Sequence, residues 1–182
     1  DQYRYLVQAE PVWETLKAAN PDCKTAVLFS QNTLYGGADY VISPKPMHTD
    51  EGLIQWCYSK PVNLYETVAK DLGRPFNLMD YWGPLTSPKG SEWIMDAAIW
   101  LVENHCPNFM MTYLPLLDYS SQKFGPDAPV VTDELAVIGN LLDKFTGVLE
   151  REGIWEKSTI CIFSEYSMSR VDEALLLNLA LR

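Results

Sequence analysis

The sequence predicts an α/β domain in which helices cover both faces of a largely parallel β-sheet. Two observations support this prediction. Short apolar runs rich in β-branched and aromatic residues recur along the chain, and segments with helical periodicity lie between them. Such alternation is typical of parallel sheets, because two parallel strands need a crossover connection, which is usually a helix. We therefore expect a three-layer α/β/α sandwich.

Three runs have the composition of strands that are buried on both faces. They are residues 25–30 (TAVLFS), 109–114 (FMMTYL) and 159–164 (TICIFS). A short, continuous apolar run is typical of a strand that is covered by helices on either side. Cys161 lies within the last run and Cys23 stands just before the first, so both thiols are expected to be buried.

Helical patterns are expected before each run. The clearest covers Asp133 to Glu152, where apolar residues recur at spacings of three and four and would form one stripe, at Leu135, Ile138, Leu142, Phe145 and Leu149. Thr132 is expected to be its N-cap and Gly153 to follow its last turn. Further helices are expected at Pro11 to Ala19, Leu64 to Leu72 and Glu92 to Asn104.

The chain is expected to form one domain, because 182 residues allow a sizeable core but are short for two domains. Residues 36–90 are rich in Pro, Gly and aromatic residues, and we expect them to form a cap-like insertion over one sheet edge. The aromatic residues of this segment allow two interpretations, the lining of a pocket for a flat group or ordinary core packing. They are Trp56, Tyr58, Tyr65, Tyr81 and Trp82.

The charge balance excludes some partners. Acidic residues outnumber basic ones 24 to 14, which gives a net charge of −10 and no general attraction for nucleic acid or anionic lipid. No apolar run approaches the roughly 18 residues of a membrane span, and the first residues lack the pattern of a signal peptide. The four cysteines form no Cys-x-x-Cys pair. We expect a soluble protein, with the cytoplasm slightly favoured.

Oxygen-bearing side chains follow the second and third predicted strands. Asp118 and Asp127 come after residues 109–114, and Glu165 and Tyr166 come directly after residues 159–164. Ligands of open α/β sheets gather at the carboxyl ends of strands, and oxygen atoms suit a hard divalent cation. Spacing alone leaves an alternative, in which Asp118 hydrogen-bonds within its own loop and Glu165 faces water.

Two motifs resemble those of a known family. Residues 113–126 (YLPLLDYSSQKFGP) resemble the strand-end motif in which nucleotide pyrophosphatases carry Asp-x-x-x-His followed by Gly-Pro. Residues 163–168 (FSEYSM) resemble the Ser-Asp-His-Gly-Met turn of the same proteins. The chain is thus similar to the type I phosphodiesterase/nucleotide pyrophosphatase family of the alkaline phosphatase superfamily. The likeness is clearest over residues 107–171, and the earlier part resembles a variant bacterial subgroup.

The resemblance implies a metal-dependent phosphoester hydrolase with an alkaline phosphatase-like fold. In the family, each motif supplies an Asp and a His to one of two divalent metal ions. Carried over to this chain, the metal ligands are Asp118, Gln122, Glu165 and Tyr166. Only Asp118 is unchanged, and the all-oxygen set favours manganese, magnesium or calcium over zinc. The implied substrate is a phosphoester or nucleotide-like small molecule.

Other family residues have no match. The nucleophile, a Thr or Ser at a helix N-terminus, and a further Asp ligand belong before the matched motifs, and another His ligand belongs after them. We therefore expect an incomplete alkaline phosphatase-like domain with the nucleophile outside this chain, and self-association through its open sheet edge. Two alternatives stay open. One is a non-catalytic binding or interaction module that has lost the histidine ligands, and the other is a flavodoxin-like protein with a chance resemblance.

The two histidines indicate no second active site. Neither His48 nor His105 lies in a motif with an acid and a nucleophile, so a Ser-His-Asp or Cys-His enzyme is poorly supported. His105 lies near the end of a predicted helix, where a cationic ring would interact favourably with the helix dipole. The Gly36–Gly37 pair lacks the lysine of a phosphate-binding loop and is expected to form a turn.

Overall fold

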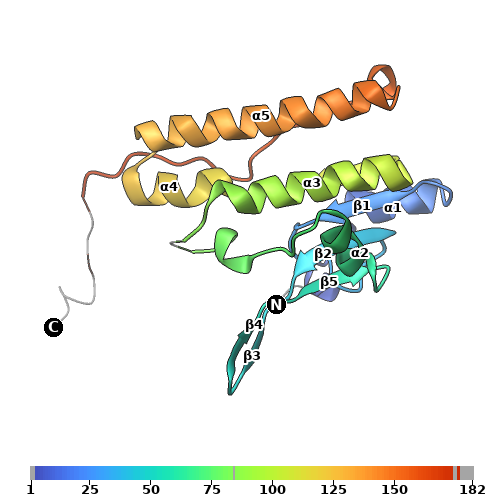
Figure 1. The fold of residues 1–182 in the computed structure, drawn as a ribbon, viewed down its shortest axis with the longest axis horizontal. Helices are drawn as coiled ribbons and strands as arrows, with labels where there is room; N and C mark the ends of the chain where they lie inside the picture. The colour runs from blue at the N-terminus through green and yellow to red at the C-terminus, as the bar shows by residue number, and fades with distance from the viewer. Residues whose placement is uncertain (1–2, 84, 174–175, 177–182) are drawn as a thin grey trace.

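A four-stranded sheet forms the centre of the molecule (Figure 1). The structure is a computed structural model that describes residues 3–83, 85–173 and 176. The strand order is β5-β2-β1-β6, where β1 pairs in parallel with β2 and β6, and β2 pairs antiparallel with β5. The strands are β1 (Thr25–Leu28), β2 (Tyr40–Pro44), β5 (Cys57–Lys60) and β6 (Phe109–Thr112). The prediction of a largely parallel α/β sheet is confirmed.

The helices lie on both faces of this sheet. They are α1 (Val12–Ala19), α2 (Leu64–Asp71), α3 (Pro88–His105), α4 (Leu116–Phe124) and α5 (Pro129–Arg151), with short 3-10 helices η1 (Arg4–Leu6), η2 (Leu78–Asp80) and η3 (Trp155–Lys157). Trp13 of α1 packs on Val27 and Val41, which point to one face. Ala26 and Ile42 point to the opposite face, because neighbouring strand residues alternate, and belong to the core that includes α2 and α3. Helices thus cover both faces of the sheet, as expected for an α/β/α sandwich.

The central helix α3 separates the sheet from α5, which packs on the other side of α3 (Figure 1). Ile94, Ala97 and Leu101 of α3 are fully buried. Pro88 occupies the first turn, where the missing N–H costs nothing. No helix within the described residues is long and apolar enough to cross a membrane.

The ends of α5 differ in part from expectation. The helix begins at Pro129 with Ala128 as N-cap, so the prediction that Thr132 is the cap is wrong. The reason is that proline is already fixed at a helical φ and is favoured in the first turn. The other end is confirmed: Gly153 has a φ of 69° and its N–H donates to the carbonyl of Glu150 at 3.0 Å.

The apolar stripe of α5 is confirmed except at its start. Ile138, Leu142, Phe145 and Leu149 pack on or within the core, whereas Leu135 is 57% exposed. A core-facing helix buries a face wider than one line of residues, so Val137, Leu141 and Val148 join the contact.

The third predicted strand is wrong. Residues 159–164 have no regular structure, and all of their side chains are exposed, with Ile162 at 73% and Phe163 at 71%. Apolar, β-branched composition indicates that burial would be favourable. A strand also needs a neighbouring strand to satisfy its backbone, however, and the described residues provide none for this segment. Cys161 is therefore exposed, against expectation, while Cys23 is buried as predicted. The strand at 109–114 is confirmed, but β6 is only half-buried because it lies at the sheet edge.

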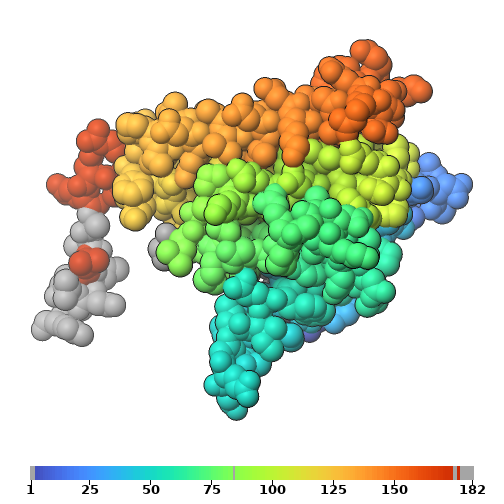
Figure 2. Space-filling model, viewed as in Figure 1, coloured from blue at the N-terminus to red at the C-terminus, as the bar shows by residue number. Residues whose placement is uncertain are grey.

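Residues 36–90 contribute two strands to the sheet, β2 and β5. Between these strands, β3 (Met47–Thr49) and β4 (Gly52–Ile54) form a hairpin that stands out from the body of the molecule (Figure 2). Tyr81 is buried and Tyr65 packs on the core, which confirms core packing for these two rings. Trp56 and Trp82 are exposed at 37% and 38%.

Candidate functional site

The candidate site begins where the chain leaves β6. Helix α4 starts four residues after β6 and is anchored by Leu116, which is almost completely buried. Asp118 lies in the first turn of α4, and its N–H donates to the carbonyl of Pro115 at 3.1 Å. β6 is parallel to β1, so Asp118 lies beyond the carboxyl ends of both strands. This is the edge at which α/β proteins bind ligands.

Three of the four predicted ligands are in direct contact. The Gln122 side-chain amide donates to Asp118 Oδ1 at 2.8 Å, because residues four apart share one face of a helix. The Tyr166 hydroxyl donates to the same Oδ1 atom at 2.7 Å, although 48 residues separate the two. The chain returns past α5 to make this contact (Figure 1). We call Asp118, Gln122, Glu165 and Tyr166 the Asp118 cluster.

Glu165 belongs to the cluster through electrostatics and not through a hydrogen bond. Its side chain is exposed and makes no hydrogen bond or ion pair within the described part of the chain. The pKa of Tyr166 is raised mainly by its hydrogen bond to Asp118, then by desolvation and by the nearby carboxylates, including Glu165. The cluster therefore holds a neutral phenol against a carboxylate.

Tyr113 is a neighbour that the sequence analysis did not single out. Burial is the main reason that its pKa is raised, and the carboxylates of Asp118 and Glu165 raise it further. Thr112, at the end of β6, has a buried hydroxyl without a hydrogen-bond partner in the described structure. Both residues lie in the last half of the predicted strand 109–114, and that position was the signal that could have identified them. Asp127 is exposed and makes no hydrogen bond or ion pair with the cluster within the described residues.

The chemistry of the donors fits a hard cation. Asp118, Glu165 and Tyr166 offer oxygen atoms, and Gln122 would offer its carbonyl oxygen if its amide turned over. A cation on Asp118 Oδ1 would have to replace the two donors that now contact it. The described residues contain no group of three or more His, Cys, Asp or Glu side chains that could hold a metal ion. Any cation here therefore depends on the Gln and Tyr oxygens.

The histidines lie elsewhere. His105 stacks on Tyr40, with ring centroids 4.5 Å apart. The pKa of His105 is lowered by burial and by nearby Lys24, which disfavours the cationic form of the ring at this helix end. His48 lies in β3, in the protruding hairpin.

The fold and the Asp118 cluster define an α/β protein with an oxygen-rich site beyond the carboxyl end of parallel strands. The family model described as Type I phosphodiesterase / nucleotide pyrophosphatase matches residues 1–182. The chain belongs to this family, whose members are generally metal-dependent and act on phosphoester or nucleotide substrates. Searches of curated proteins and of solved structures found no match. The predicted family is thus confirmed.

Proposed function

We propose that this chain carries part of the metal site of a phosphodiesterase or nucleotide pyrophosphatase-like hydrolase. The observation that supports the proposal is the convergence of Gln122 and Tyr166 on one oxygen of Asp118. These residues come from two segments far apart in the sequence, and they occupy the positions that correspond to the family's ligands. The family match over residues 1–182 supports the same assignment.

In this proposal Asp118 and Gln122 hold one divalent ion, and Glu165 and Tyr166 hold a second. Magnesium, manganese and calcium suit these oxygen donors better than zinc does. Bound ions of this kind would neutralise charge on a phosphoryl group and polarise it. The hydrogen bonds from Gln122 and Tyr166 orient the Asp118 carboxylate. A bound cation would take the place of these two donors on Asp118 Oδ1. The proposal assigns the nucleophile to no residue of this chain.

We also propose one domain over residues 1–182, in which the β3–β4 hairpin is the cap-like part of residues 36–90, and self-association through exposed apolar surface. The large exposure of Ile162 and Phe163 supports self-association, because burying such side chains against a second copy is favourable. The four free cysteines fit a reducing compartment such as the cytoplasm.

A second candidate function is a non-catalytic binding or interaction module with the same fold. One observation favours it. Asp118 Oδ1 already accepts two protein hydrogen bonds, so the site is satisfied without a metal ion.

Calorimetric titration of the purified chain with manganese and with zinc tests the hydrolase proposal. We expect manganese to bind, and to bind more tightly than zinc. Asp118→Asn should weaken manganese binding by about tenfold or more, because it removes the anionic ligand. Asp127→Asn is the matched control, since it removes an exposed carboxylate that follows the same helix.

Two results would contradict the proposal. In the first, manganese does not bind to the folded chain, which would favour the interaction module. In the second, both Asp→Asn variants bind manganese as the original chain does, which would place the ion outside the Asp118 cluster.

A further inference from the structure

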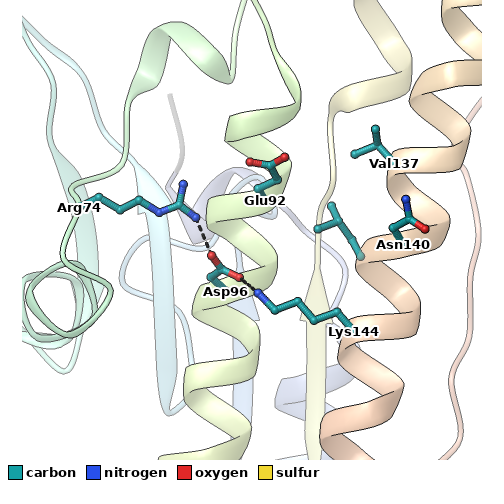
Figure 3. Close-up of a pocket in the computed structure, with 7 residues that line it drawn as sticks. Arg74, Glu92, Asp96, Val137, Asn140 and Lys144 are labelled. Carbon is teal, nitrogen blue, oxygen red and sulfur yellow. Dashed lines mark hydrogen bonds and ion pairs between the residues drawn. The ribbon is translucent and has the colours of Figure 1, made fainter.

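A cavity of about 390 Å³ lies between α3 and α5 (Figure 3). Sites for small molecules have volumes of this order. Charged, polar and apolar side chains line it together, namely Arg74, Glu92, Asp96, Val137, Asn140, Leu141 and Lys144. None of these residues belongs to the Asp118 cluster.

One side of the cavity carries excess positive charge. Asp96 accepts a hydrogen bond from Arg74 at 2.5 Å and another from Lys144 at 2.6 Å. The Asp96 side chain is 19% exposed, whereas Arg74 and Lys144 are 41% and 55% exposed, so both cations also face solvent at the mouth of the cavity. Two cations share one carboxylate, which leaves a net charge of +1. A guanidinium and an ammonium group have eight N–H donors in all, so most of them remain free for a ligand.

The other side carries a carboxylate with no partner of its own. Glu92 precedes Asp96 by one turn on the same face of α3 and is partly buried. It makes no hydrogen bond or ion pair with any residue that the structure describes. Figure 3 shows Glu92 on the cavity side of α3, opposite Val137 and Asn140 of α5. Glu92 and Asp96 are separated by one helical turn, ~5–6 Å along the axis.

Part of the cavity wall on α5 is apolar. Leu141 is 7% exposed and packs in the core, and Val137 is partly buried against it. A ligand with a cationic group, an anionic group close to it and an apolar portion would complement this lining. A simple anion such as phosphate would face the uncompensated charge of Glu92, and a simple amine would face Arg74 and Lys144.

We propose that this cavity binds a small zwitterion, an α-amino acid with an apolar side chain. Its ammonium group pairs with Glu92, its carboxylate accepts hydrogen bonds from Arg74 and Lys144, and its side chain contacts Val137 and Leu141. This binding site is independent of the proposed hydrolase function, because it shares no residue with the Asp118 cluster.

A ligand series on the unmodified chain tests the proposal. L-leucine, N-acetyl-L-leucine and L-leucine amide are titrated by calorimetry. The second ligand lacks the ammonium group, and the third lacks the carboxylate. We expect leucine to bind and each derivative to bind about tenfold more weakly or worse, because each loses one charged contact. If leucine gives no binding heat, or if the derivatives bind as well as leucine, the proposal is wrong.

Variants locate the site. Glu92→Gln should weaken leucine binding by about tenfold and leave N-acetyl-L-leucine unchanged, because the acetylated ligand has no ammonium group to lose. Asp143→Asn is the control, since Asp143 precedes Lys144 on α5 but is exposed and does not line the cavity. Equal effects of the two substitutions, or tighter binding of inorganic phosphate than of leucine, would overturn the proposal. If Glu92→Gln does not fold, the ligand series decides alone.

Discussion

At the scale of single residues, Glu14 joins three segments of the chain. Its carboxylate accepts hydrogen bonds from Arg4 Nε and Nη2, both at 2.8 Å, and from the N–H of Gly37 at 3.0 Å. A side chain at Gly37 would meet Glu14, because an added Cβ atom would lie 2.9 Å from Glu14 Cγ. The Gly36–Gly37 segment therefore packs closely against Glu14 of α1.

Glu14→Gln should lower the free energy of unfolding more than Glu51→Gln does at neutral pH. The hydrogen bond from Arg4 lowers the pKa of Glu14, whereas Glu51 is an exposed hairpin residue. A carboxylate with a lowered folded-state pKa stabilises the protein above its ordinary pKa of 4.5, and this stabilisation is lost as the pH falls through the folded pKa. Urea unfolding at pH 7 and at about pH 3 measures both effects.

The excess effect of Glu14→Gln should be smaller at the acid pH than at pH 7. If the two variants lose equal stability at pH 7, the Arg4–Glu14 pair contributes nothing beyond an exposed charge.

At the scale of elements, contact with α3 determines which face of α5 is buried. Apolar residues lie on more than one line along α5, and contact with α3 selects those near Leu141 and Leu149. Lys144 of α5 reaches Asp96 of α3 at the side of this contact, and Arg151 of α5 pairs with Glu103 of α3. Ion pairs thus lie at the margin of the apolar contact between α3 and α5.

Leu141→Ala should lower the free energy of unfolding by about 2–4 kcal/mol, because it removes a buried side chain and leaves a cavity. Leu135→Ala, on the same helix but 57% exposed, should cost less than about 0.5 kcal/mol. Urea unfolding of both variants measures the difference. Similar costs for the two substitutions would mean that α5 presents a different face to α3.

At the scale of the whole molecule, the core contains groups that resist ionisation. Tyr81 is 2% exposed and packs among Phe29, Phe76 and Trp93 on α3. Burial is the main reason that the pKa values of Tyr81 and Cys57 are raised. Unfolding would expose both groups to water, where they ionise at their ordinary pKa values.

The free energy of unfolding should therefore fall as the pH rises above about 9. The unfolded chain releases the Cys57 proton near its ordinary pKa of 9.0, while the folded chain retains it, so alkaline pH favours unfolding. Cys57→Ala should reduce the loss of stability between pH 7 and pH 10, because the variant has no Cys57 thiol to ionise when the chain unfolds. Cys106→Ala, at an exposed cysteine, is the control. An unchanged pH dependence in Cys57→Ala would contradict this account.

The sequence by itself determined the class of fold, four helices, two sheet strands and the family. These features follow from local patterns, such as the apolar run at β1 and the spacing of Ile138, Leu142 and Phe145, which hold whatever the neighbours are. Asp118 and Gln122 could also be paired from the sequence, because a spacing of four places both on one face of a helix.

Only the tertiary structure decided which apolar segments are buried and which distant side chains meet. Residues 159–164 have the composition of a strand but have no partner strand in the described structure. Leu135 continues the apolar stripe of α5 in sequence but is 57% exposed. The Tyr166–Asp118 hydrogen bond spans 48 residues, and the cavity beside Asp96 joins three separate segments. Contacts of this kind depend on how α3, α4 and α5 pack together, which no local pattern of residues specifies.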